Sequence, residues 1–359
     1  MLKTSRTRRL LGAALVVPAF AAALVLSACS PGSTGADGDG KLSVVATTTQ
    51  LADFAREVGG DHVKVTGLLT AGASAHHFDP SQKDLLALGG ADVLIVNGAG
   101  LEGFVDAAVK ASGFTGETIT AADGVDLDEA RHITEEGEEE GHDHADEHDH
   151  DHADEHDHDE EDGHDHGDIN PHLWTSVRIS SDMVGEIAKG LAAADPANAA
   201  DYTARAEAYQ KRLAALDEWI GAQFDRVPAS ERILVTGHDS LRYYLHDYDI
   251  AFAGSIMPSF EDNAEPSAAA IDELIAEIKE HGVKAIFVES SMSPKLAETI
   301  AKEAGITVVK ADSLYADSLG VAGSGAENYI DATVHNTRLI LEAWGAKIDP
   351  VPEAVGASK

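Results

Sequence analysis

The sequence predicts an α/β protein of two similar parallel-sheet lobes that are joined by one long helix. Two observations point to this fold class. Short runs rich in Val and Ile alternate with helix-forming segments, and this alternation occurs twice along the chain. Between the two occurrences lies one long helical pattern. The roughly 320 residues that follow the N-terminal segment also exceed what one hydrophobic core usually holds.

The first lobe is predicted over residues 41–180. Its strands are expected at Leu42–Ala46, Val63–Leu69, Val93–Asn97 and Glu117–Ala121. Its helices are expected at Gln50–Val58, Ser81–Leu88 and Leu101–Ala111. Strands of this length that are separated by helices of about ten residues are typical of a parallel sheet.

An insertion at about residues 135–168 interrupts this pattern. From Gly137 to Asp168 the segment consists of Asp, Glu, His, Gly and Ala, so it cannot bury enough apolar surface to offset the entropy of ordering. We therefore expect it to be disordered. Its nine histidines are His142, His144, His148, His150, His152, His156, His158, His164 and His166.

A linking helical region is predicted over residues 181–227, with one long helix at about 198–224. Apolar residues recur there at steps of three and four, and a helix of this length measures about 40 Å. The second lobe follows at 228–348, and residues 349–359 are expected to form a flexible tail. Its strands are expected at Ile233–Thr236, Ile250–Gly254, Ala285–Glu289 and Thr307–Lys310. Its helices are expected at Ser240–His246, Ser267–His281, Pro294–Ala304 and Glu327–Trp344.

The N-terminus has the pattern of an export signal. Basic residues precede an apolar run from Leu10 to Leu26, and Leu26-Ser27-Ala28-Cys29 resembles a bacterial lipobox. We predict a lipoprotein signal peptide at 1–28, a lipid on Cys29 and a Gly/Ser/Pro/Asp-rich tether at 29–40. The alternative is a membrane-spanning helix, although the apolar run is short for a bilayer crossing. Export by the Sec or the twin-arginine route stays open.

The cysteine count and the net charge limit the kinds of metal site and binding partner that the chain can have. Cys29 is the single cysteine, so the chain has no internal disulfide and no thiolate metal site. The formal net charge of −37 argues against nucleic acid and favours cations. About half of this charge is local, since 19 acidic residues and no Lys or Arg lie between Glu135 and Asp168.

Four separated positions carry candidate metal ligands. His76 follows the second predicted strand, His172 follows the insertion, His238 follows the first strand of the second lobe, and Asp317 follows its last strand. Ligands bind at the carboxyl ends of strands in open α/β sheets. Three imidazoles and one carboxylate that meet between the lobes suit a tetrahedral zinc ion.

The motifs around these residues resemble the metal-binding lipoproteins, or solute-binding proteins, of zinc and manganese ABC transporters, and specifically the zinc type. The resemblance extends from about residue 42 to 348. It rests on these motifs: His76-x-Phe78-x-Pro80, Asn170-Pro171-His172-Leu173-Trp174, Thr236-Gly237-His238-Asp239, Glu265-Pro266-Ser267, Phe287-Val288-Glu289 and Leu314-Tyr315-Ala316-Asp317-Ser318-Leu319-Gly320.

The resemblance implies that His76, His172, His238 and Asp317 bind the metal. Manganese-selective relatives tend to have glutamate where this chain has His238, which favours Zn²⁺ here over Mn²⁺ or Cd²⁺. Glu289 is a possible ligand or a residue that orients one, and Asp312 and His77 are the rivals of Asp317 and His76.

The implied function is capture of zinc outside the cytoplasmic membrane and its delivery to the permease and ATPase of an ABC importer. We expect a monomer, anchored by Cys29, with a zinc chaperone as a further possible partner. The insertion is either a solvated acidic loop or a collector that binds zinc weakly at its histidines.

Two other functions stay open. One is zinc storage, a chaperone or an adhesin on the same fold. The other is an exported zinc enzyme, but the sequence has no His-Glu-x-x-His and four protein ligands would leave no open position for water. We therefore predict that the protein is not an enzyme.

Overall fold

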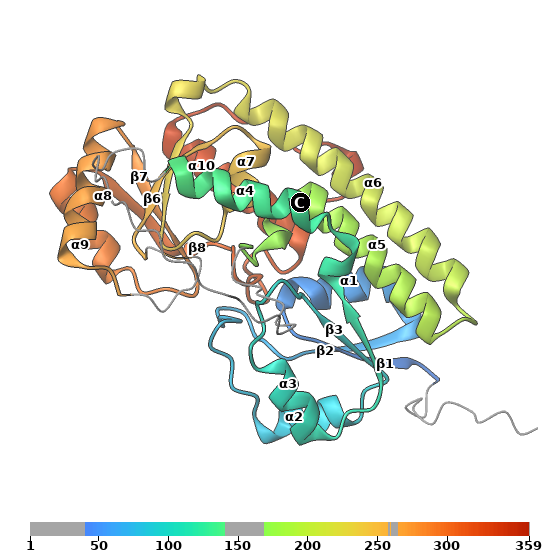
Figure 1. Ribbon diagram of the computed structural model, residues 1–359. Coiled ribbons are helices and arrows are strands. Elements are labelled where there is room, and N and C mark those ends of the chain that lie inside the picture. Colours follow the sequence, from blue (N-terminus) through green and yellow to red (C-terminus); the bar gives the residue numbers. More distant parts are fainter. Residues whose placement is uncertain (1–39, 141–168, 258, 260–264, 359) are drawn as a thin grey trace, which may run out of the picture. The chain divides into compact units, whose positions relative to one another are not determined.

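The computed structural model describes residues 40–140, 169–257, 259 and 265–358, without the side chains of 137–140 and 310–313 (Figure 1). These described residues form one compact unit. The predicted signal peptide, Cys29 and the nine histidines of the insertion lie outside the described residues. Within the described part, no helix is both long and apolar enough to cross a membrane.

The first lobe contains a four-stranded parallel sheet. Its strands are β1 (Leu42–Ala46), β2 (Val63–Gly67), β3 (Val93–Val96) and β4 (Glu117–Thr120), in the order β2-β1-β3-β4. Val44 of β1 pairs with both Val65 and Val93. The central strands are buried on both faces, as the runs of Val, Leu and Ile predict.

The second lobe repeats this architecture. Its strands are β5 (Ile233–Thr236), β6 (Ala251–Ser255), β7 (Ala285–Glu289) and β8 (Thr307–Leu314), again parallel and in the equivalent order β6-β5-β7-β8. The predicted fold class is therefore confirmed. β8 is longer than predicted, because after a register shift Leu314 still pairs with Glu289 at the end of β7.

Helices connect the strands of each sheet, and one further helix follows the last strand of the second lobe. In the first lobe they are α1 (Thr49–Gly59), α2 (Gln82–Gly89) and α3 (Val105–Ser112). In the second lobe they are α7 (Arg242–Asp247), α8 (Ala268–Glu280), α9 (Lys295–Ala304) and α10 (Tyr329–Trp344). Several begin at side-chain caps: Thr48 accepts a hydrogen bond from the Leu51 amide, and Ser81 and Asp84 form a capping box.

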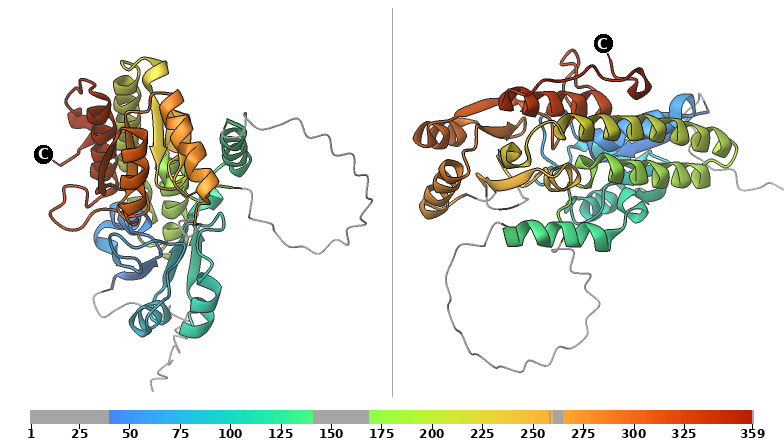
Figure 2. Two further views of the ribbon diagram at one scale, coloured as in Figure 1. Left: turned by 90° about the vertical axis from the view of Figure 1, so that its left-hand side faces the viewer. Right: turned by 90° about the horizontal axis from the view of Figure 1, so that it is seen from above.

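The long helix that joins the lobes packs against a second helix. α5 (Val177–Ala194) and α6 (Ala199–Phe224) lie side by side in Figures 1 and 2. α6 is the predicted long helix. Its buried residues Leu213, Leu216 and Ile220 belong to the same hydrophobic core as Ile187 and Leu191 of α5.

Two segments differ from the expectation. Helix α4 (Leu127–Glu140) covers residues 135–140, which we had assigned to the disordered insertion; Glu is a good helix former, and Asp126 caps the helix by accepting hydrogen bonds from the amides of Asp128 and Glu129. The C-terminal residues are packed rather than flexible. Val355 is fully buried, and Arg212 of α6 donates hydrogen bonds to the carbonyls of Val355 and Gly356.

Candidate metal centre

Four loops bring the predicted ligands together. His76 lies in the loop between β2 and α2, and His172 immediately precedes the 3₁₀ helix η3 (Leu173–Thr175). His238 lies two residues after β5, and Asp317 lies three residues after β8. The carboxyl ends of parallel strands face one edge of a sheet, which explains why loops from both lobes reach the same place.

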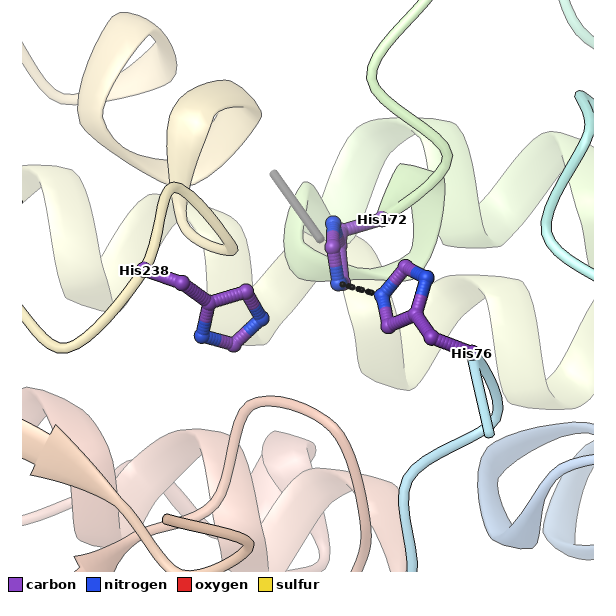
Figure 3. Close-up of side chains that lie close together, drawn as sticks. All are labelled: His76, His172 and His238. Carbon is purple, nitrogen blue, oxygen red and sulfur yellow. Dashed lines mark hydrogen bonds between the residues drawn. The ribbon is translucent and has the colours of Figure 1, made fainter. Parts of the chain in front are cut away.

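The donor atoms face one another at short range. Figure 3 shows the three imidazole rings, with His238 opposite His76 and His172. The Nε2 atoms of His76 and His172 are 3.2 Å apart. Asp317 Oδ1 lies 3.2 Å from His238 Nε2 and 3.7 Å from His172 Nε2. Each of the three histidines offers one nitrogen atom, and these three atoms lie within 4.8 Å of one another, which is close enough for a single ion.

The site is largely closed to water. His172 is 1%, His238 0% and Asp317 4% exposed, while His76 is half-buried. Among the described residues, both ring nitrogens of His238 and Oδ1 of Asp317 are buried without a well-directed hydrogen bond. Buried polar atoms in proteins are normally satisfied. A cation bound by Nε2 of His238 and Oδ1 of Asp317 would satisfy these two atoms.

Asn170 fixes the orientation of His172. Its Oδ1 lies 2.8 Å from Nδ1 of His172 and also accepts from the His172 amide. Its own Nδ2 donates to the carbonyl of Asp239 at 2.6 Å, and its carbonyl accepts from the Tyr243 hydroxyl. The proton of His172 is therefore assigned to Nδ1, which leaves Nε2 unprotonated and pointed at the other ligands.

Glu289 plays the corresponding part for His238. Glu289 Oε1 lies 3.3 Å from Nδ1 of His238 and accepts from the Ser240 hydroxyl at 2.9 Å. The carboxylate is fully buried at the end of β7. Gly237 permits this close approach, because a Cβ at that position would overlap Glu289 Oε2 and Met292 Sδ.

The electrostatics of the cluster fit a cation. Burial lowers the pKa of His172 well below its ordinary value, so this ring is neutral. Burial acts in the same direction on His238, but Asp317 and Glu289 outweigh it and raise the pKa of His238 well above the ordinary value. For Asp317, burial is outweighed by His238, which lowers the pKa of the carboxyl. A proton on His238 thus balances part of the negative charge that a divalent ion would balance.

The remaining candidates lie elsewhere or outside the described side chains. His77 is exposed and is not part of the three-histidine group. Asp312 lies within β8 rather than after it, and its side chain is not among those described. Glu289 contacts His238 as stated above. No role was predicted for Asn170, although its place two residues before His172 in a Pro-containing segment is a usable signal.

The two parallel-sheet lobes and the cluster of imidazoles between them define a class of two-lobed, metal-binding solute-binding proteins. Residues 44–343 match the family described as zinc-uptake complex component A, periplasmic. The chain belongs to this family, and it is a metal-binding protein of ABC transporters rather than an enzyme.

Similar proteins carry the names of several metals. The manganese-binding lipoprotein MntA of Bacillus subtilis is 30% identical over 332 residues, which cover 92% of this chain and 98% of that protein. The zinc-binding protein TroA of Treponema pallidum is 27% identical over 321 residues, which cover 87% of this chain and 92% of that protein. The solved TroA structure superposes with a TM-score of 0.70 at 23% identity and covers 86% of this chain and 100% of its own, which shows the shared fold.

Proposed function

We propose that this protein captures Zn²⁺ outside the cytoplasmic membrane and delivers it to an ABC-type importer. His76, His172, His238 and Asp317 are the proposed ligands. The observation that carries the proposal is the spacing of their donor atoms. Ligands at 2.0–2.1 Å from a tetrahedral zinc ion are about 3.3 Å from one another, and three of the spacings here are 3.2, 3.2 and 3.7 Å.

The donor set supports zinc over manganese. Imidazole nitrogens suit zinc, whereas Mn²⁺ prefers carboxylate, carbonyl and water oxygens. With three imidazoles and one carboxylate, the proposed site has the composition of a closed zinc centre with no position left for water. Names of relatives do not decide between metals, because they include manganese-binding, zinc-binding and iron-transporting proteins. Mn²⁺ and Cd²⁺ are the competing ions.

The division of the proposed ligands between the lobes supports delivery. His76 and His172 come from the first lobe, and His238 and Asp317 come from loops after β5 and β8 of the second. A small separation of the lobes would remove two ligands at once and free the ion. The proposed lipid on Cys29 would hold the protein at the outer face of the membrane, beside the permease and its ATPase.

Two experiments test this function. His238→Glu exchanges a nitrogen for an oxygen donor and is expected to shift the preference from zinc toward manganese in a competition titration. In a strain that lacks the chain, the gene for the wild-type protein is expected to restore growth in zinc-depleted medium, whereas the His238→Ala gene is not. Equal growth with the two genes would refute delivery through this site.

A further inference from the structure

The loop that carries Asp317 belongs to the second lobe but is held by the first. Residues 315–319 follow β8. The carbonyl of Ala316 accepts two hydrogen bonds, one from Trp174 Nε1 at 2.7 Å and one from Gln50 Nε2 at 3.0 Å. Trp174 lies in η3, and Gln50 lies in the first turn of α1. Both donors therefore belong to the first lobe, whereas the acceptor, Ala316, belongs to the second.

Two further contacts hold Ser318 and Leu319 of the same loop against the first lobe. The Leu319 amide donates to Thr49 Oγ1 at 2.9 Å, and the Gly72 amide donates to Ser318 Oγ at 2.7 Å. The Thr49 hydroxyl donates to Gln50 Oε1 at 2.9 Å. This last bond orients the amide of Gln50 so that its NH₂ group faces the Ala316 carbonyl.

Because Gln50 and Trp174 are buried, their hydrogen bonds restrict the position of the Ala316 carbonyl. Gln50 is 1% and Trp174 is 3% exposed, so neither donor has ready access to bulk water. A buried donor that loses its partner carries the full cost of desolvation. The Ala316 carbonyl is therefore strongly preferred at its observed position, and with it the next residue, Asp317.

The geometry couples this contact to the metal site. Trp174 lies two residues after His172, and Ala316 lies one residue before Asp317. Nε2 of His172 and Oδ1 of Asp317 are 3.7 Å apart, and their sequence neighbours Trp174 and Ala316 are joined by the hydrogen bond described above.

We propose that Gln50 and Trp174 are positioning residues that form a latch on the Ala316 carbonyl and thereby set how fast the metal leaves. The latch holds Asp317 against the ion, and its release lets the carboxylate swing away first. This inference rests on the proposed zinc site. In this proposal, Gln50 and Trp174 of the first lobe do not touch the metal. They control the position of Asp317, a ligand from the second lobe.

The test compares Gln50→Met and Trp174→Phe with a matched control. Both variants remove a donor and keep most of the side-chain volume. Gln223→Met is the control, because Gln223 is also a buried glutamine that donates to a backbone carbonyl, that of Trp219, but it lies at the end of α6. Zinc dissociation is measured by stopped flow with an excess of chelator, and the stability of the metal-free protein is measured by thermal unfolding.

We expect each latch variant to release zinc about tenfold faster, the factor that one lost hydrogen bond supplies, with the association rate unchanged. Gln223→Met is expected to lower the melting temperature without changing the release rate. A second readout is the visible spectrum of the Co²⁺-loaded protein, which is intense for four-coordinate and weak for higher-coordinate cobalt. It should weaken in the latch variants as water enters.

Wild-type release rates and Co²⁺ spectra in both latch variants would overturn the latch and leave the zinc site standing. Faster release in the control to the same extent would also overturn it, because the effect would then be general destabilisation. Failure of the wild-type protein to bind zinc tightly would instead overturn the proposed function itself.

Discussion

Nε2 of His238 lies 3.2 Å from Oδ1 of Asp317, and the two residues extend from different strands of the second sheet. Both atoms are buried, and neither has a well-directed hydrogen bond among the described residues. The pair therefore presents one nitrogen and one oxygen to the imidazoles of His76 and His172.

Removing one proposed ligand should abolish tight zinc binding. A four-ligand zinc site is worth on the order of 10–16 kcal/mol, so His172→Ala or His238→Ala is expected to cost about 3 kcal/mol or more, a loss of about 100-fold or greater in affinity. Competition with a zinc chelator measures it. His62→Ala is the control, because His62 pairs with Asp201 at the surface. High affinity retained in either ligand variant, with the fold intact by circular dichroism, contradicts the four-ligand site.

Glu289→Gln tests whether the carboxylate behind His238 contributes to affinity. The substitution keeps the shape of the side chain but removes the charge 3.3 Å from Nδ1 of His238. Loss of such a partner typically costs 10- to 100-fold in metal affinity, and we expect a loss in that range. Isothermal titration gives the value. If Glu289 were itself a ligand, the loss would match that of His238→Ala instead.

Because Asp53 is buried, we expect the free energy of unfolding to fall as the pH rises. Burial raises the pKa of Asp53 from 3.8 to about 6, although the Tyr329 amide donates a hydrogen bond to it. The folded protein thus keeps a proton that the unfolded chain has lost between about pH 4 and pH 6. Over this range the free energy of unfolding should fall by about 3 kcal/mol from this group, and the loss is complete above pH 6.

Asp53→Asn removes this titration and keeps an oxygen that can accept from the Tyr329 amide. We expect the variant to match the wild type near pH 4 and to be more stable by about 1–3 kcal/mol at pH 7.5. Urea unfolding at the two pH values provides the comparison. An equal difference between the two proteins at both pH values would show that Asp53 does not titrate in this way.

Deleting residues 141–167 should distinguish zinc that is bound by the insertion from zinc that is bound at the central site. The deletion begins after α4, whose last residue is Glu140. We expect the number of weakly bound zinc ions to fall, because nine histidines are removed, while one tight ion remains. Equilibrium dialysis with metal analysis counts the ions. Unchanged stoichiometry together with unchanged growth in low zinc would refute a collecting role for the insertion.

Local sequence patterns predicted much of the fold because its strands are short, apolar and regularly spaced. All eight predicted strands are present, and β1, β5 and β7 have the predicted bounds. The end of β8 was missed because it depends on pairing with the end of β7 after a register shift, which no local pattern records. Helix α5 was not separated from the linking region, although Met183, Ile187 and Leu191 recur at its buried face.

The candidate ligands were predictable because each lies at a recognisable strand end or motif. Their supporting residues were less so. Asn170 acts through Asp239, Tyr243 and His172, and Gln50 acts through Ala316, 266 residues away. Such contacts join distant segments through backbone carbonyls. Because every residue type offers the same carbonyl, the sequence carries little sign of the partner.

Competition among Zn²⁺, Mn²⁺ and Cd²⁺ for the purified protein tests the central claim most directly. The insertion is removed so that only the central site is counted, and bound metal is measured after dialysis against equimolar ions. We expect one tightly bound zinc ion that displaces manganese and that is lost in His238→Ala. Retention of manganese in place of zinc, or zinc binding that His238→Ala leaves unchanged, would contradict it.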